Sequence, residues 1–337
     1  MTPKFARRDF LRGAAGAALA LPLFTRAPFL SAAQAPTGSG KAFRGIFAIL
    51  QTPFTLHDEL DEEDLEREVK FCVRAGAQGL VWPQLAGEFY LLTEAERRRG
   101  AEILLRSAGG SCASVIGVQA GSKEIAIEFA RHAESKGADA VIALPPFLGP
   151  VTLETAADYY RSIAAAIRLP VFIQNSGGEW GPALPTSFVI QLAREYPQLA
   201  YIKEEISPVP HRIGEYKSSG VMKGIFSGNA GRNLLNELAR GASGTMPACQ
   251  FVDVDVQIYS LAAAGNWTEA RALAQKLLPM IILEETYGVG FAKTVLVRRG
   301  IFKTAKRRGV ASLEVLDSVD QQEFDAWWQQ LAPYLRA

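Results

Sequence analysis

Lys203 is the residue whose type and position most clearly suggest chemistry. It ends an apolar run, residues 199–202, and is followed by Glu204 and Glu205. A lysine that points from the end of a strand into a partly desolvated pocket has its charged form disfavoured, and a neutral amine can attack a carbonyl carbon to form an imine. The alternative is a solvated lysine that only marks the end of a strand.

Glu205 and Gln174 are the candidate partners of this lysine. Residues two apart on a strand share a face, so Lys203 and Glu205 are expected to point the same way. A carboxyl group there can shuttle protons during imine formation, although its ionised form favours the charged lysine. The alternative is a rim glutamate paired with a surface base. Gln174 lies near the end of an earlier apolar run and can donate and accept hydrogen bonds, but it does not titrate.

Eight short apolar runs alternate with longer segments of helical period after residue 44. The expected strands are residues 46–51, 79–82, 114–118, 140–144, 171–175, 200–204, 224–227 and 244–246, and the helices between them include residues 61–75, 94–107, 123–136, 153–167, 186–196 and 233–239. Eight such units predict an α/β fold, a (β/α)8 TIM barrel, rather than an open doubly wound sheet. No GxGxxG fingerprint follows the first strand, which argues against dinucleotide binding.

The chain is expected to have four parts. Residues 1–35 are predicted to be a twin-arginine-type signal peptide, because Arg7 and Arg8 precede a short apolar stretch and residues 33–35, Ala-Gln-Ala, give a small-x-small cleavage pattern. The alternative is an uncleaved anchoring segment. Residues 36–44 form a short leader, 45–265 the barrel, and 266–337 a C-terminal helical extension. Further helices are expected over residues 251–264, 268–285 and 321–335.

Export through the twin-arginine pathway predicts a mature protein that is periplasmic or otherwise exported, without stable membrane anchoring. Hydrophobic residues make up 48% of the 337 residues, and the net charge is +1. A large core can therefore form, and no charge excess points to nucleic acid. Cys72, Cys112 and Cys249 are far apart and are expected to be small buried hydrophobes. The three histidines form no metal-binding pattern, so neither a metal nor another cofactor is expected.

Several segments resemble, in their shared order, the dihydrodipicolinate synthase and N-acetylneuraminate lyase family over most of the mature chain. They are Thr-Pro-Phe at 52–54, Leu-Ala-Gly-Glu-Phe at 85–89, Leu-Thr-Glu-Ala-Glu-Arg at 92–97, Leu-Pro-Pro-Phe at 144–147, Ile-Lys-Glu at 202–204, Ser-Gly-Asn at 227–229 and Gly-Ala-Ser-Gly at 241–244. The resemblance implies a TIM barrel, a Schiff base at Lys203 and a small-molecule carbonyl substrate. It also implies a homo-oligomer, either a tetramer or a dimer.

The departures from the family pattern bear on function. The resemblance places the family's proton-transfer tyrosine at Gln174, its partner threonine at Leu85 and a second tyrosine at Phe147, so three hydroxyl groups are lost. The paired threonines that hold the substrate carboxylate fall at Leu85 and Ala86. Backbone N–H groups around Ala86 and Gly87 can still bind an anion.

The remaining expected site residues complete the predicted pocket. The resemblance places Glu179 near the position where the family's synthases have an arginine that binds the carboxylate of the incoming aldehyde. An acid at this position disfavours an anionic second substrate. Catalytic roles are expected for Lys203, Gln174 and Glu205. The predicted substrate-binding residues are Leu85, Ala86, Gly87, Phe147, Asn175, Glu179 and Met246.

We therefore expect a Schiff-base-forming lyase, an aldolase or a dehydratase, that acts on a small 2-oxo acid or a related carbonyl compound. Dihydrodipicolinate synthesis is not expected, because the usual proton relay is missing. One alternative, motivated by the three lost hydroxyl groups, is a catalytically altered barrel that binds a small molecule without turnover. Another is a barrel enzyme with unrelated chemistry. Trapping an imine at Lys203 separates the first two interpretations.

Overall fold

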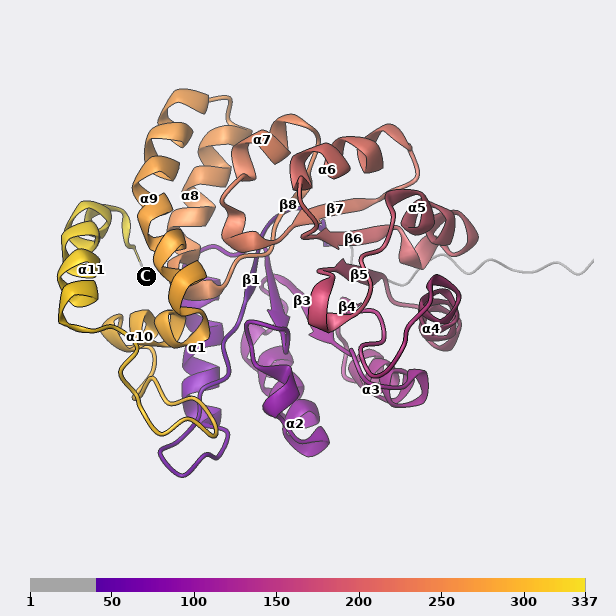
Figure 1. Ribbon diagram of the computed structural model, residues 1–337, viewed down its shortest axis with the longest axis horizontal. Coiled ribbons are helices and arrows are strands. Elements are labelled where there is room, and N and C mark those ends of the chain that lie inside the picture. The colour runs from indigo at the N-terminus through magenta and orange to yellow at the C-terminus, as the bar shows by residue number, and fades with distance from the viewer. Residues whose placement is uncertain (1–40, 337) are drawn as a thin grey trace, which may run out of the picture. The chain divides into compact units, whose positions relative to one another are not determined.

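A closed barrel of parallel strands forms the centre of the structure (Figure 1). The computed structural model describes residues 41–336, so the expected signal peptide lies outside the described residues. Each strand pairs with the next, and β8 pairs with β1. The predicted (β/α)8 TIM barrel is therefore confirmed. The strands are β1 (Gly45–Ile49), β2 (Gly79–Trp82), β3 (Ala113–Gly117), β4 (Ala140–Ala143), β5 (Val171–Asn175), β6 (Tyr201–Glu204), β7 (Gly224–Ser227) and β8 (Gly244–Thr245).

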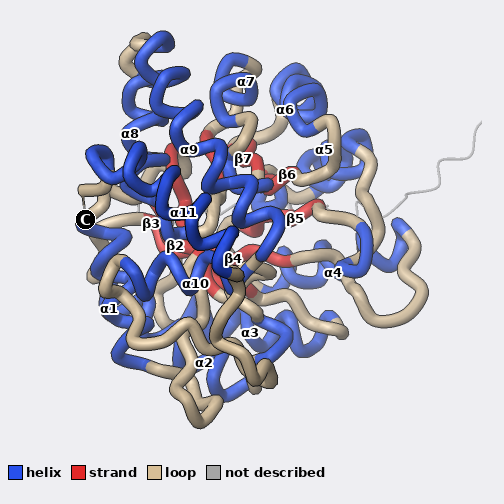
Figure 2. The backbone as a smooth tube through the Cα atoms, turned by 60° about the vertical axis from the view of Figure 1, so that its left-hand side comes forward, coloured by secondary structure: helices blue, strands red, loops and turns tan. Residues whose placement is uncertain are grey.

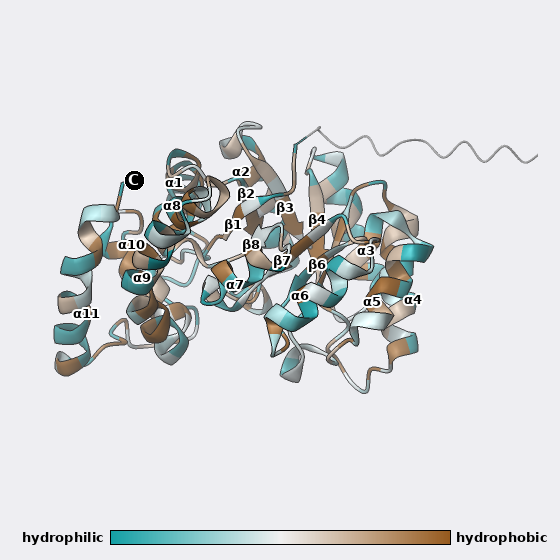
Figure 3. Cartoon of the chain, turned by 90° about the horizontal axis from the view of Figure 1, so that it is seen from above, coloured by the Kyte–Doolittle hydropathy of each residue, from teal (hydrophilic) through white to brown (hydrophobic). Residues whose placement is uncertain are grey.

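A ring of helices surrounds these strands (Figure 2). Each of these helices contributes buried apolar residues to the main core, as expected for amphipathic helices. Figure 3 shows hydrophobic and hydrophilic residues along the same helices. Caps fix the helix starts: Asp61 accepts a hydrogen bond from Asp64 N, and Thr93 forms a capping box with Glu96. The helices are α1 (Glu62–Arg74), α2 (Glu94–Ala108), α3 (Lys123–Ser135), α4 (Leu153–Ala166), α5 (Thr186–Glu195), α6 (Val209–Ser218), α7 (Leu234–Ala239) and α8 (Val252–Ala263).

Aromatic side chains fill the inside of the barrel. Phe47 of β1 lies 4.7 Å from Phe226 of β7, and Phe172 of β5 lies 5.1 Å from Tyr201 of β6, between ring centroids. Gly79 makes room for this layer, because a Cβ there would lie 2.4 Å from the Phe47 ring. The lower barrel is therefore a packed core, and chemistry is confined to the carboxyl ends of the strands.

The C-terminal extension consists of α9 (Trp267–Tyr287), α10 (Val289–Arg298) and α11 (Ser318–Leu331). Helix α9 packs on α8, and α10 and α11 both pack on α9 (Figure 2). Helices α6 and α10 were absent from the predicted set. Within residues 41–336, no helix combines the length and hydropathy that crossing a bilayer requires. The division at residue 265 stays a prediction.

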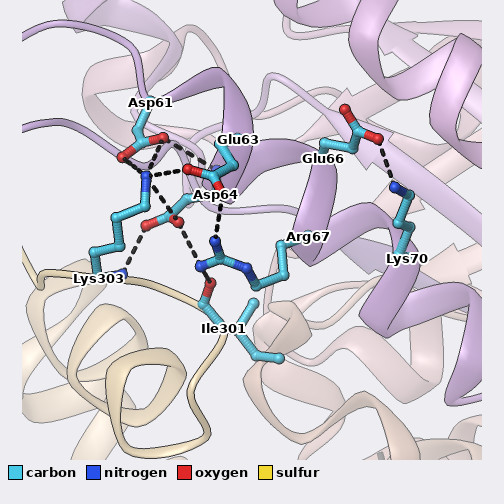
Figure 4. Close-up of polar contacts among 8 residues, drawn as sticks. All are labelled: Asp61, Glu63, Asp64, Glu66, Arg67, Lys70, Ile301 and Lys303. Atoms are coloured by element: carbon cyan, nitrogen blue, oxygen red, sulfur yellow. Dashed lines mark hydrogen bonds and ion pairs between the residues drawn. The ribbon is translucent and has the colours of Figure 1, made fainter.

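An ion-pair cluster attaches the segment after α10 to the start of α1 (Figure 4). Lys303 Nζ lies 3.0 Å from Asp61 Oδ2, and Lys303 N donates to Asp64 Oδ2 at 2.7 Å. Arg67 Nη1 donates to Ile301 O at 2.9 Å. Burial raises the pKa of Asp64, and the bond from Lys303 opposes that shift. The cluster thereby connects the extension to the first βα unit of the barrel.

Candidate active site

Lys203, Glu205 and Gln174 meet at the carboxyl end of the barrel. Lys203 on β6 pairs in register with Gln174 on β5, and its side chain is only 4% exposed. Lys203 Nζ lies 3.2 Å from Glu205 Oε1, and Gln174 Nε2 donates to Glu205 Oε2 at 2.6 Å. The structure thus brings together the three residues predicted to be catalytic. The carboxylate of Glu205 lies between the amine and the amide.

The backbone around Glu205 holds its side chain against Lys203. Glu205 N donates to Asn175 O at 3.0 Å, which continues the pairing of β5 and β6 by one residue. Asn229 Nδ2 donates to Glu205 O at 3.2 Å. Gly228 leaves the space that the carboxylate occupies, because a Cβ there would lie 2.3 Å from Glu205 Oε1. A larger residue at 228 would therefore displace Glu205 from the amine.

Glu204 points away from the site and fixes the end of β6. Its buried carboxylate accepts hydrogen bonds from Tyr216 Oη at 2.8 Å, Asn175 Nδ2 at 3.0 Å and Ile206 N at 2.7 Å, and it pairs with Arg212 Nε at 3.0 Å. Burial raises the pKa of Glu204, and these donors oppose the shift. The network holds β6 in place from outside the barrel, which positions Lys203 on the inside.

A cavity of about 250 Å³ opens beside Lys203. Three of the predicted substrate-binding residues line it, namely Leu85, Ala86 and Met246, together with Lys203 and Glu205. Leu85 and Ala86 offer only apolar side chains next to the amine. The wall near the β2 loop can therefore bind a polar group only through the backbone.

Asn175 does not line this cavity, and the prediction that its side chain binds substrate requires correction. Gly87 is also outside the lining, and anion binding by the backbone N–H groups around it stays a prediction. The side chain of Asn175 lies on the opposite face of β5 from that of Gln174, where Nδ2 donates to Leu184 O at 2.9 Å as well as to Glu204. The carbonyl oxygen of Gly87 accepts a hydrogen bond from Thr52 Oγ1. Both groups are used by the framework of the barrel.

Phe147 and Glu179 also lie outside the lining of the cavity. Phe147 packs against Phe89 and Trp180, with ring centroids 5.6 Å and 5.7 Å away. Glu179 is exposed on the short 3-10 helix Gly178–Trp180, which follows β5. The structure therefore places these two residues in the loops around the barrel mouth, away from Lys203.

Gln51 lines the cavity and was not among the predicted site residues. It follows β1, and by strand alternation it shares a face with Ile49, which also lines the cavity. The side chain is fully buried, and neither amide atom has a hydrogen-bond partner within residues 41–336. An unpaired buried amide costs about 1–3 kcal/mol, and both amide atoms of Gln51 are available to a water molecule or a ligand in the cavity.

Gln51→Leu is expected to leave the melting temperature unchanged or to raise it, because no hydrogen bond within the described chain is lost and an apolar group replaces an unpaired amide. Gln84→Leu is the matched control. Gln84 is equally buried but donates through Nε2 to Gln119 Oε1 at 3.0 Å, so its loss should lower the melting temperature. Thermal unfolding of both variants measures this, and a larger loss for Gln51→Leu would contradict the assignment.

Glu284 and Glu285 enter the cavity from the end of α9. Gln250 Nε2 donates to Glu284 Oε2 at 2.6 Å, whereas Glu285 pairs with Arg232. Burial raises the pKa of Glu284 to about 7. No pattern in the sequence marks these residues, because only the packing of the extension brings α9 to the cavity. The polar end of the predicted strand 46–51 did offer a signal for Gln51.

The chain resembles known proteins along most of its length. The model of the dihydrodipicolinate synthetase family matches residues 42–324. The probable 2-dehydro-3-deoxy-D-pentonate aldolase YjhH of Escherichia coli (strain K12) is 30% identical over 260 residues, covering 75% of this chain and 86% of that protein. The L-2-keto-3-deoxyarabonate dehydratase of Azospirillum brasilense is 28% identical, covering 79% of this chain and 87% of that protein. The crystal structure of dihydrodipicolinate synthase from Rhodopseudomonas palustris superimposes with a TM-score of 0.78 at 26% identity, covering 86% of this chain and 97% of the other.

The barrel, its site and these relatives together define a Schiff-base lyase of the class I aldolase type, acting on a small carbonyl compound. The chain belongs to the dihydrodipicolinate synthetase family.

Proposed function

We propose that Lys203 forms the imine with a 2-oxo acid that carries hydroxyl groups, and that the enzyme then acts as an aldolase or a dehydratase. The observation that carries this proposal is the buried lysine next to a carboxylate and an amide at the end of β6. An amine held beside a proton acceptor can pass a proton to it and then attack a carbonyl carbon. Both named sugar-acid relatives act on compounds of this class, by their names.

Charge in the cavity supports a hydroxylated substrate over one with a second carboxylate. Among the described residues that line the cavity, Lys203 is the only cation, and it faces Glu205, Glu284 and Glu285. A second carboxylate would meet this excess of acidic groups. Hydroxyl groups can donate to the carboxylates and can pair with both amide atoms of Gln51. The same excess of acids disfavours the anionic aldehyde used in dihydrodipicolinate synthesis.

Imine formation requires proton transfer at Lys203, and Glu205 is placed for it. The Glu205 carboxylate takes a proton from the ammonium 3.2 Å away, and the neutral amine attacks the C2 carbonyl carbon. The carboxyl group then returns the proton to the departing hydroxyl, which leaves as water. Gln174 holds Oε2 of Glu205 throughout and does not itself titrate.

Borohydride reduction followed by intact-mass measurement tests the proposal. Incubation with pyruvate or with L-2-keto-3-deoxyarabonate should give a reduced adduct on one lysine, which peptide mapping should identify as Lys203. Loss of water with all carbons retained would indicate a dehydratase, and release of pyruvate with an aldehyde would indicate an aldolase. If no carbonyl compound gives an adduct, the barrel binds its ligand without imine chemistry and the proposal is wrong.

We infer that the chain is exported by the twin-arginine pathway and is cleaved after Ala35, so that the mature protein begins near Pro36. Arg7, Arg8 and the Ala-Gln-Ala pattern support this inference. Cell fractionation and N-terminal sequencing of the mature protein test it. Replacing both arginines with lysine should leave the precursor in the cytoplasm, and unchanged export would contradict the pathway.

We also infer a homo-oligomer, a tetramer or a dimer. Tyr90 is half exposed and packs 5.0 Å from Trp180 in the loops at the barrel mouth, and Leu148 is exposed. Exposed apolar and aromatic side chains of this kind favour burial against a second copy. Light scattering after gel filtration gives the mass directly, and a monomer at micromolar concentration would contradict the inference.

A further inference from the structure

We propose that Glu284 is the acid–base residue of this lyase, removing and returning the proton at C3, the carbon next to the imine carbon. The assignment rests on the proposed imine at Lys203. Under this proposal the C-terminal extension supplies a catalytic group, because Glu284 belongs to α9 and not to the barrel.

The geometry of the cavity leaves Glu284 as the available carboxyl group. Glu205 has both oxygens engaged, one with Lys203 and the other with Gln174. Glu285 is paired with Arg232. Glu284 receives one hydrogen bond, from Gln250 to Oε2, and no other described residue bonds its Oε1. One oxygen of Glu284 is therefore oriented by the protein while the other can accept a proton.

The fold holds Glu284 at the wall of the cavity. Helix α9 ends at Tyr287, and Gly288 has a φ of 60°, which turns the chain directly into α10. Gly288 and Val289 line the same cavity as Glu284 and Lys203. The turn therefore places the end of α9 in the wall of the cavity that also holds Lys203.

Electrostatics suit this role. Burial raises the pKa of Glu284 to about 7, the hydrogen bond from Gln250 lowers it, and the neighbouring Glu285 raises it further. An acid–base residue is most effective when its pKa lies near the working pH. The charged groups that act on Glu284 are Asp255 from α8 and the adjacent Glu285, which is paired with Arg232. Lys203 and Glu205 line the same cavity.

The step balances without a further reactant. Lys203 Nζ condenses with C2 of the 2-oxo acid and water leaves, which gives an iminium ion. The Glu284 carboxylate takes a proton from C3, the electron pair of the C–H bond forms the C2–C3 double bond, and the C2–N pair returns to nitrogen to give an enamine. In the reverse direction the carboxyl group returns the proton to C3. The base therefore needs to be ionised at the start of the step.

Exchange of the pyruvate methyl protons in D₂O, followed by proton NMR, tests the assignment on the full mature chain. Glu284→Gln keeps an acceptor for Gln250 and should still give the borohydride-trapped imine, but exchange should fall on the order of 10²-fold or more. In the unaltered enzyme, exchange should rise through a pH of about 7 as Glu284 ionises, and this rise should disappear in the variant. Glu269→Gln, at an exposed residue in the first turn of the same helix and outside the lining of the cavity, should retain exchange within about threefold.

The outcomes separate this assignment from the proposed function. If Glu284→Gln still traps the imine and exchanges protons at the unaltered rate, or if Glu269→Gln loses as much exchange, the role of Glu284 is overturned while the imine chemistry stands. Absence of trapped imine in the unaltered enzyme would overturn the imine chemistry and this role with it. Glu284→Asp guards against a folding effect, since it should fold and retain part of the exchange. If Glu284→Gln or Glu284→Asp is folded but no longer gives the trapped imine, Glu284 has a structural role and is not the acid–base residue.

Discussion

Lys203→Arg is expected to give no borohydride adduct with any 2-oxo acid and to lower turnover on the order of 10³-fold or more. Arginine keeps a positive charge beside Glu205, 3.2 Å away in the unaltered protein, so the carboxylate retains a partner. A guanidinium group stays protonated and cannot form the imine. Loss of activity in this variant therefore reports on the amine and not on an unpaired buried carboxylate. Intact mass after reduction and a coupled pyruvate assay are the measurements.

Lys223→Arg is the control for this substitution. Lys223 is exposed immediately before β7, so the change should leave both the adduct and the turnover as they are. Circular dichroism should show the same fold for both variants. An adduct of unchanged mass and yield in Lys203→Arg would place the imine on another lysine, and turnover that persists without any adduct would favour unrelated barrel chemistry.

The barrel was predictable because its signal is local. Short apolar runs of the right length recur eight times, and the predicted runs 79–82, 171–175 and 224–227 coincide with β2, β5 and β7. Helix α6 was missed because it begins beside Pro208 and Pro210, residues that ordinarily mark a turn. Helix α10 was missed because only a glycine turn separates it from α9. No cluster of polar residues lies between the two helices to mark a loop.

The site was predictable only where one strand carries it. Alternation along β6 predicted that Lys203 and Glu205 share a face, and Lys203 Nζ lies 3.2 Å from Glu205 Oε1. The same rule, applied to β5, puts Asn175 on the face opposite Gln174, so the expected role of Asn175 contradicted the periodicity from the start. Glu284 could not be found this way, because it reaches the cavity through the packing of a helix some eighty residues further along the chain.

Part of the wall of the cavity therefore depends on how the extension is attached to the barrel. Lys293 of α10 pairs with Glu88, which follows the β2 loop, and both side chains are almost fully buried, at 0% and 4% exposure. Lys293 Nζ also donates to Lys306 O at 3.0 Å and lies 4.7 Å from the centroid of the Phe54 ring. Burial lowers the pKa of Lys293, and the carboxylate of Glu88 opposes that shift. The pair is thus a buried charge pair whose members stabilise each other.

Lys293→Met is expected to lower the free energy of unfolding by about 3–5 kcal/mol, because it leaves the Glu88 carboxylate buried without its partner. Glu88→Gln should cost a similar amount for the converse reason. The double variant should lose clearly less than the sum of the two, since it leaves neither charge alone. Chemical denaturation of the four proteins gives these values. The lysine variant should also weaken imine formation with pyruvate, because the neighbouring Ala292 and Val289 line the cavity.

Lys303→Met provides the matched control for this cycle. Lys303 pairs with Asp61, Glu63 and Asp64 at the start of α1, but its side chain is 48% exposed, so its loss should cost clearly less than the loss of Lys293. If Lys293→Met costs no more than Lys303→Met, or if the two single losses simply add, the buried pair is not what holds α10 over the barrel mouth. If the pair does hold α10, Lys293→Met should lower both the free energy of unfolding and the yield of imine, whereas Lys303→Met should largely preserve both. The two losses are linked because α9 and α10 contribute Glu284 and its neighbours to the cavity only while they stay packed on the barrel.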